Sequence, residues 1–158
     1  MNNQEIQVTR KGFEALKSEL ADLMANKRPK AVERLERARQ EGDLRENSDY
    51  IDAKEELEFL DGRIDELKHV VDHAEIIEPQ DIVDGQVSLG TLVTLNNDGV
   101  NQEFEIVGEW EADPMKKRIS PKSPLGSKLV GKKVGDIVEV EAPAGTISYK
   151  ILEVKSLS

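Results

Sequence analysis

The sequence predicts an α+β protein of two domains: an N-terminal antiparallel α-helical coiled-coil hairpin over residues 1–78, and a C-terminal antiparallel β-sheet domain with a short helix over residues 79–158. In most of the first half, apolar residues recur at alternating steps of three and four, which is the pattern of a coiled coil. An acidic break that contains glycine interrupts this pattern at residues 41–50. After Pro79 the pattern changes to short β-branched runs separated by turn residues.

The composition favours an elongated, charged helical element over one compact globule, because aromatic residues make up 4% of the chain and charged residues 34%. The chain has no cysteine, which excludes disulfides and thiolate metal sites and is typical of a cytoplasmic protein. A net charge of −10 argues against adhesion to bulk nucleic acid or anionic lipid. No apolar run approaches the length of a membrane span, and the first residues do not resemble a secretory signal, so we expect neither insertion nor secretion.

The first arm begins at Thr9, whose hydroxyl can cap the free helix amides, and Val8 and Phe13 occupy the two positions of a hydrophobic staple. Pro29 removes a helical hydrogen bond and clashes with the preceding turn at a cost of about 3 kcal/mol. We therefore expect a kink or a short interruption, with Pro29 opening a new helical stretch. The apolar seam comprises Phe13, Leu16, Leu20 and Leu23, and resumes about one residue out of phase at Ala31, Leu35 and Ala38.

The second arm has the more regular spacing, and its seam comprises Tyr50, Ala53, Leu57, Leu60, Ile64, Leu67, Val71 and Ala74. Two arms of similar length that are joined by a few residues including Gly42 must run antiparallel, each burying the apolar stripe of the other. An arm of about 30 residues is about 45 Å long, because each residue of a helix adds about 1.5 Å. The connecting turn is therefore held far from the base of the hairpin.

The second half contains strand and helix signals of a small α+β domain. Ser123 is suited to cap a short helix, and Pro124 is suited to its first position. The predicted strands cover Leu89–Leu95, Phe104–Val107, Ile137–Val140 and Ile147–Val154.

Asp43 and Glu46 are the candidate chemical groups of the turn, since carboxylates three residues apart can point the same way. Mg²⁺ prefers oxygen ligands, and two carboxylates can complete the coordination of an ion held mainly by another macromolecule or orient a water on it. The same spacing is also that of a capping box for the second helix, which requires no function, and on spacing alone this explanation is favoured. Asn47 and Ser48 are alternative caps, so both acids need not be used in this way.

Basic residues follow one helical face of the first arm, at Lys30, Arg34 and Arg37. For most of them we expect pairing with acids of the other arm, which are Asp52, Glu55, Glu56 and Glu58. Two further basic residues lie closer to the turn, Arg39 on the first arm and Lys54 on the second. For these two we expect contact with nucleic-acid phosphates.

His69 and His73 are one turn apart, but no cysteine, third histidine or HExxH pattern accompanies them, so we expect a solvated helix face. No Gly-rich phosphate loop, nucleophile elbow or Ser/His/Asp set is present. The chain is therefore not expected to catalyse a reaction alone.

The turn Gly42-Asp43-Leu44-Arg45-Glu46-Asn47-Ser48-Asp49-Tyr50 resembles the tip signature of the bacterial Gre transcript cleavage and transcription elongation factor family, and is closer to GreA-like than to GreB-like members. Arg45 and Ser48 depart from the commoner Lys and from Ala or Gly. The similarity extends over nearly the whole chain, through Thr9-Arg-Lys-Gly-Phe, Arg28-Pro29, Glu75-Ile-Ile, Val107-Gly108-Glu109, Glu111-Ala112-Asp113, Ile119-Ser120, Ser123-Pro124-Leu125-Gly126, Leu129, Gly131-Lys132 and Gly135-Asp136.

The resemblance implies a coiled coil that enters the RNA polymerase secondary channel and an FKBP-like C-terminal domain that docks at its rim. It implies that Asp43 and Glu46 help position a second Mg²⁺ and the attacking water at the polymerase active centre, with no cofactor of the chain's own. The polymerase itself then cuts the backtracked transcript, and Arg39 and Lys54 contact the 3′ end of the nascent RNA. The resemblance thus implies a cytoplasmic, monomeric accessory factor among DNA-binding transcription regulators, rather than an enzyme.

Two alternatives stay open at this point. The first is a coiled-coil adaptor or polymerase-binding inhibitor that does not stimulate cleavage. The second is an FKBP-type prolyl isomerase, which is disfavoured because such pockets are lined by aromatic residues and the C-terminal half offers only Phe104, Trp110 and Tyr149.

Overall fold

A computed structural model describes residues 6–42 and 46–157 of the chain. The chain forms two compact units, one comprising Glu14–His73 and the other Met1–Phe13 together with Ala74–Ser158. The first unit lies within the predicted domain 1–78, and residues 1–13 and 74–78 of that predicted domain belong to the unit that contains the C-terminal half. The predicted bounds 1–78 and 79–158 stay a prediction. Among the described helices, none combines the length and the apolar character that crossing a membrane would require.

The first arm is a helix with one internal irregularity. It comprises α1 (Arg10–Asp22), the π-helical segment η1 (Leu23–Lys27) and α2 (Arg28–Gln40). Pro29 lies at the start of α2, which confirms the predicted interruption and new helical stretch. A π-helical turn adds one residue to the helix, and this extra residue accounts for the one-residue change of phase in the seam. Leu23 before the proline and Ala31 and Ala38 after it are all buried.

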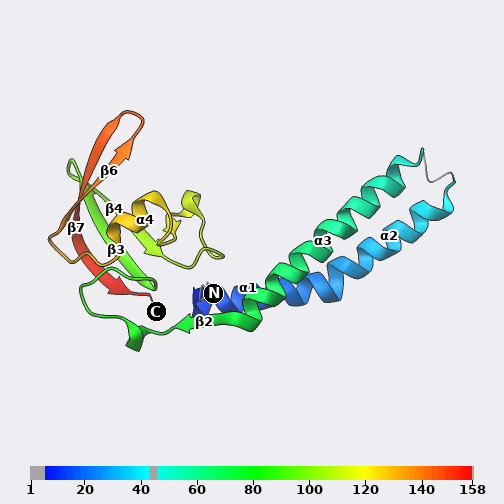
Figure 1. Ribbon diagram of the computed structural model, residues 1–158, viewed down its shortest axis with the longest axis horizontal. Helices are drawn as coiled ribbons and strands as arrows, with labels where there is room; N and C mark the ends of the chain where they lie inside the picture. Colours follow the sequence, from blue (N-terminus) through cyan, green and yellow to red (C-terminus); the bar gives the residue numbers. More distant parts are fainter. Residues whose placement is uncertain (1–5, 43–45, 158) are drawn as a thin grey trace, which may run out of the picture. The chain divides into compact units, whose positions relative to one another are not determined.

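The second arm is one helix, α3 (Ser48–His73), which packs against α2 and η1 (Figure 1). Ala53, Leu60, Ile64 and Leu67 are buried as the heptad pattern predicts, and Tyr50 and Leu57 are partly buried. Near the end of the arm, Val71 is partly buried, like Tyr50 and Leu57, and Val70 beside it is fully buried. The predicted seam position Ala74 is wrong, because Ala74 lies in a strand. The heptad pattern applies only where two helices pack against each other, and α3 ends at His73.

A two-stranded parallel sheet, which the sequence analysis did not predict, joins the two ends of the hairpin. It pairs β1 (Ile6–Thr9) with β2 (Ala74–Ile77), with Val8 opposite Ile76. The following segment carries the short 3₁₀ helix η2 (Pro79–Asp81). Val8 is fully buried, so this small sheet contributes to the core of the unit to which it belongs.

The C-terminal half contains a five-stranded sheet in the order β5-β4-β3-β7-β6. Neighbouring strands are antiparallel except for β4 and β5, which are parallel. The elements are β3 (Thr91–Asn97), β4 (Val100–Ile106), the 3₁₀ helix η3 (Pro114–Lys116), β5 (Arg118–Ile119), α4 (Pro124–Leu129), β6 (Ile137–Ala142) and β7 (Gly145–Ser156). The four predicted strands correspond to β3, β4, β6 and β7, and β5 is an addition.

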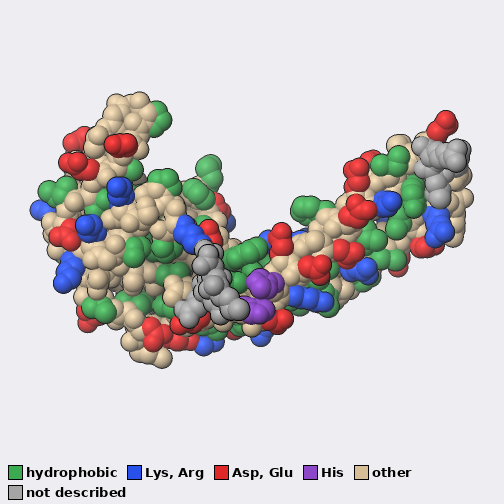
Figure 2. All heavy atoms as spheres, viewed as in Figure 1, with side chains coloured by type: hydrophobic (Ala, Val, Ile, Leu, Met, Phe, Trp, Pro, Cys, Tyr) green, Lys and Arg blue, Asp and Glu red, His purple; other side chains and the backbone are tan. Residues whose placement is uncertain are grey.

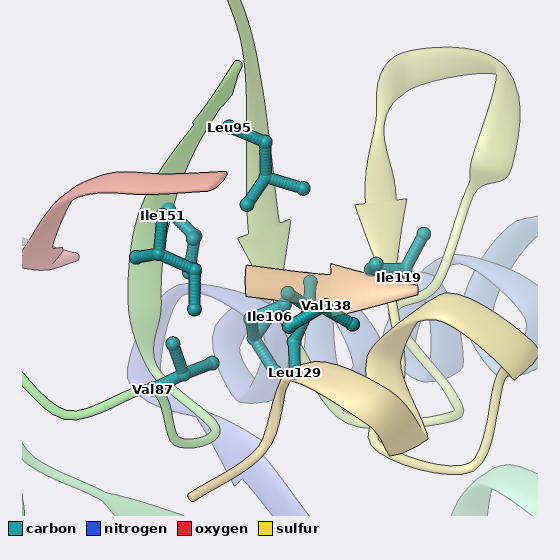
Figure 3. Close-up of a cluster of buried hydrophobic side chains, with 8 residues drawn as sticks. Val87, Leu95, Ile106, Ile119, Leu129, Val138 and Ile151 are labelled. Carbon is teal, nitrogen blue, oxygen red and sulfur yellow. The ribbon is translucent and has the colours of Figure 1, made fainter. Parts of the chain in front are cut away.

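The short helix α4 begins as predicted, since Ser123 is its N-cap and the Ser123 hydroxyl accepts a 3.0 Å hydrogen bond from the Gly126 amide. Leu129 at the end of α4 is fully buried in the core of the sheet domain. Figure 3 shows this side chain among apolar side chains of the strands and of the segment before β3. The core cluster comprises Val87, Val93, Leu95, Ile106, Ile119, Leu129, Val138 and Ile151. The α+β architecture predicted from the sequence, a helical hairpin and a mostly antiparallel sheet with one short helix, is confirmed.

Candidate functional site

The candidate site is the connection between α2 and α3, the acidic turn of the sequence analysis. After α2 the chain passes through Glu41 to Gly42, whose φ of +138° is a conformation that favours glycine. Asp43 lies outside the described residues, so its predicted role stays a prediction. Glu46 lies in the turn directly before Asn47 and is exposed to solvent. Its side chain makes no hydrogen bond or ion pair with any other described residue.

Asn47, rather than the predicted capping box, caps α3. The Asn47 Oδ1 atom accepts a 3.1 Å hydrogen bond from the Tyr50 amide, and the Asn47 carbonyl accepts one of 3.1 Å from Ile51. Glu46 precedes this cap, so its carboxylate does not occupy the third helical position that a capping box requires. A capping box therefore does not explain Glu46. Asp49 does have a structural explanation, because it lies in the first turn of α3, where a negative charge is favourable.

The other end of the Asn47 side chain reaches the first arm. Its Nδ2 atom donates a 2.6 Å hydrogen bond to the backbone carbonyl of Ala38, in the last turn of α2. The same carbonyl accepts a 3.2 Å hydrogen bond from the Glu41 amide. One half-buried side chain thus connects the last turn of one arm to the first turn of the other.

The two basic residues assigned to RNA lie close to the turn. Arg39 is one residue before the end of α2, and Lys54 is six residues, or about 9 Å, beyond the start of α3. Both are exposed, and neither pairs with an acid that the structure describes. Acidic and basic side chains otherwise alternate along the hairpin (Figure 2).

Three arginines further along the arms bind acids across the hairpin. Their pairs are Arg34 with Glu56 at 2.5 Å, Arg28 with Asp61 at 2.7 Å, and Arg63 with Glu19 at 2.9 Å. The predicted pairing of Arg34 with the other arm is therefore confirmed. The hydrogen bonds that Arg28 donates to Asp61 and Arg63 donates to Glu19 raise the pKa values of both guanidinium groups. These arginines hold the arms together and differ in this respect from Arg39.

The histidine pair forms no metal centre with the groups around it. His69 and His73 are exposed, with ring centroids 4.4 Å apart, and the Nδ1 atom of His73 lies 2.9 Å from the His69 carbonyl oxygen. Among residues 6–42 and 46–157, no three His, Cys, Asp or Glu side chains gather closely enough to hold a metal ion.

Sequence reasoning named Asn47 as a possible cap, which the structure confirms, but it missed the bond of Asn47 to the first arm and the role of Glu111. Asn47 was considered only as an alternative cap, because its bond to Ala38 exists only once both arms are assembled. Glu111 carried no local signal, yet its side chain is 1% exposed and accepts hydrogen bonds from the amides of Thr9 and Gly108. The partners of Glu111 include Thr9, which is 102 positions away in the sequence. No local sequence pattern reveals such a contact.

Comparisons with known proteins agree with the division into a helical and a sheet half. The family model described as "Transcription elongation factor, N-terminal" matches residues 6–76. The model described as "Transcription elongation factor, GreA/GreB, C-term" matches residues 82–156. Together they span almost the whole chain.

Curated relatives extend over the same length. Transcription elongation factor GreA of Thermoanaerobacter pseudethanolicus is 46% identical and covers 94% of this chain and 96% of its own. The Rickettsia felis protein of the same name is 42% identical over 97% of this chain and 96% of its own. Among solved structures, GreA factor homolog 1 of Thermus thermophilus is 25% identical over 97% of this chain and 100% of its own, with a TM-score of 0.45. The resemblance drawn from the tip residues is confirmed by the family models and the curated relatives, and the chain belongs to the GreA/GreB family of transcription elongation factors.

Proposed function

We propose that this protein inserts its coiled coil into the secondary channel of RNA polymerase and stimulates the polymerase's own endonucleolytic cleavage of backtracked transcripts. The observation that carries the proposal is the state of Glu46. Its carboxylate lies exposed at the far end of a long hairpin, and capping of α3 by Asn47 leaves it available to another macromolecule. The second arm alone, with 26 residues, provides a reach of about 39 Å.

The chemistry assigned to the chain is the donation of carboxylate oxygens. Exposed carboxylates are hard ligands that suit Mg²⁺, and Glu46 fits this requirement as one ligand beside Asp43. A second Mg²⁺ at the polymerase active centre, held with the help of these two residues, would supply an activated water for in-line attack on the phosphodiester. Glu46 and Asp43 also orient the attacking water by accepting its hydrogen bonds. The chain needs no cofactor of its own and acts as an accessory factor.

Arg39 and Lys54 bind phosphates of the extruded RNA 3′ end. Both are exposed near the turn and have no acidic partner among the described residues, whereas Arg34 is already neutralised by Glu56. A cation without an acidic partner can bind a phosphate at a lower cost in free energy, since no existing ion pair must be broken.

The sheet domain serves for docking at the polymerase rim. For the alternative of prolyl isomerisation, the aromatic residues of this half are poorly placed. Phe104 and Tyr149 pack against the core cluster, so their rings contribute to folding. As a factor that acts on RNA polymerase, the protein works in the cytoplasm, and a single copy suffices for the proposed activity.

Cleavage by purified backtracked elongation complexes tests the proposal. Wild-type protein accelerates transcript cleavage, and Asp43→Ala and Glu46→Ala each reduce the acceleration by about a hundredfold or more, as expected for a lost catalytic ligand. Glu41→Ala is the matched control, because it removes an exposed acid just before the turn and keeps the acceleration.

Two results would favour the other candidates. Cleavage at the intrinsic rate with wild type, Asp43→Ala and Glu46→Ala alike, with polymerase binding intact, indicates an adaptor. A wild-type protein that binds and slows the intrinsic cleavage indicates an inhibitor. Either result refutes the proposed function.

A further inference from the structure

We propose that Asn47 is a positioning residue for the carboxylate of Glu46, because it joins the two helix ends that flank the turn. The inference rests on the proposed function, in which Glu46 must be presented accurately to another enzyme. Asn47 touches neither RNA nor metal in this proposal and acts through the backbone that it fixes.

The geometry uses both ends of one amide group. Oδ1 of Asn47 accepts from the Tyr50 amide in the first turn of α3, and Nδ2 donates to the Ala38 carbonyl in the last turn of α2. The first bond is an ordinary N-cap. The second is not needed for capping, and it bridges two segments that the turn separates by nine positions in the sequence.

Few side chains can make both bonds. Free amides give the start of a helix a partial positive charge, and free carbonyls give the end of a helix a partial negative charge. The linking group must therefore accept on one side and donate on the other, as an amide does. Aspartate caps α3 equally well but has no donor for Ala38 when ionised, and serine caps with a shorter side chain that carries no amide.

The consequence for Glu46 follows from covalent connectivity. Glu46 directly precedes Asn47, so its Cα atom is held about 3.8 Å from a residue that is anchored on both arms. Without the bond to Ala38, the end of α2 and the start of α3 can move apart, and the Glu46 carboxylate moves with them. Misplacement of a reacting group by about 1 Å can cost about a hundredfold in rate.

The decisive variants are Asn47→Asp and Asn47→Ser, which keep the cap and remove the donor. Asn26→Asp is the matched control, since it introduces the same charge at an exposed asparagine in the first arm, whose side chain donates a 2.8 Å hydrogen bond to Asp22. Cleavage by backtracked complexes is measured over a range of factor concentrations. We expect both Asn47 variants to lower the maximal rate about tenfold at an unchanged half-saturating concentration, with Asn26→Asp behaving as wild type.

Other results overturn the inference. These are wild-type rates for both Asn47 variants, a change confined to the half-saturating concentration, or a loss for Asn47→Asp that Asn47→Ser does not share. A lower helix content of Asn47→Asp by circular dichroism also overturns it, since the defect would then lie in the cap.

A second readout separates this inference from the proposed function. The Glu41 amide bonds to the Ala38 carbonyl, so loss of the bridge should loosen the last turn of α2. Hydrogen exchange of that amide, followed by NMR, is expected to be about tenfold faster in Asn47→Asp than in wild type or Asn26→Asp. If wild type does not stimulate cleavage, the proposed function fails, and the exchange rate alone decides whether Asn47 joins the arms. An unchanged exchange rate refutes the bridge.

Discussion

The carboxylate of Glu111 accepts hydrogen bonds from both the backbone amide and the hydroxyl of Thr9, a residue 102 positions earlier in the chain. The Thr9 hydroxyl in turn accepts a 3.0 Å hydrogen bond from the Gly12 amide, which caps α1 as the sequence predicts. The Gly108 amide binds the same carboxylate at 3.0 Å, and the Arg118 guanidinium lies 3.8 Å away. One buried side chain therefore supports the start of α1 and the loop after β4.

Removal of this carboxylate is expected to destabilise the protein. Glu111→Ala leaves the amides of Thr9 and Gly108 buried without an acceptor, which is expected to lower the free energy of unfolding by about 2–4 kcal/mol. Glu111→Gln keeps one acceptor oxygen and is expected to lose less. Urea unfolding followed by circular dichroism measures the difference. The control is Glu109→Ala, which breaks an exposed ion pair with Lys122 and is expected to change stability by less than about 0.5 kcal/mol. Equal stabilities for the Glu109 and Glu111 variants would contradict the assigned role.

Two glycines in helices give opposite predictions for the same substitution. A Cβ atom at Gly12 would lie 1.8 Å from Oε1 of Glu111, while a Cβ atom at Gly62 would meet nothing within 4 Å. Gly12→Ala is therefore expected to cost about 3 kcal/mol, because the buried Glu111 side chain cannot move aside. Gly62→Ala is expected to add about 0.5–1 kcal/mol through helix propensity. Thermal unfolding of the two variants tests this, and shifts of the same sign would show that the packing at Gly12 is misassigned.

The π-helical segment η1 is expected to be convertible to a regular α-helix while the apolar seam of the first arm stays buried. In a Pro29→Ala background, deletion of the exposed Asn26 shortens the arm by the one residue that the π turn adds, so Ala31 and Ala38 keep their buried face. We expect a regular helix with an unfolding temperature equal to or above that of wild type, because an internal proline costs about 3 kcal/mol in a helix. Deletion of Asn26 with Pro29 retained is the comparison and should be less stable. A large loss of stability in the double variant would show that the π turn is required for another reason.

Arg39 and Lys54, which have no acidic partner among residues 6–42 and 46–157, are expected to act on RNA, and the paired Arg34 is expected to act on folding. Arg39→Gln and Lys54→Gln each remove one exposed charge, which is expected to reduce stimulated cleavage about threefold to tenfold with little change in stability. The effect should shrink as ionic strength rises, because salt weakens phosphate contacts. Arg34→Gln is the control, since it breaks the pair with Glu56 and should leave cleavage near the wild-type rate. An equal loss for all three variants would count against specific contact by Arg39 and Lys54.

The sequence by itself determined the two arms, their antiparallel course and four of the five strands in the sheet of the C-terminal half. These features follow from local patterns, such as the heptad through Ala53, Leu60 and Ile64, the proline that interrupts the first arm, and the turn residues between strands. Local patterns are informative where neighbours in the chain share one buried face. The assignment of Asp43 and Glu46 as tip acids was also made in this way, because they belong to one short motif, and it stays a prediction.

Only the tertiary structure decided how the ends of these elements are held. It replaced the predicted capping box by Asn47, ended the second arm at His73, and paired β1 with β2 at the base of the hairpin. It also placed the Glu111 carboxylate against Thr9. The pairing of β1 with β2 and the contact of Glu111 with Thr9 depend on groups that are far apart in the sequence and meet only after folding. A hydrogen bond between such groups produces no periodic pattern in the sequence, so it can be recognised only when the positions of both partners in the fold are known.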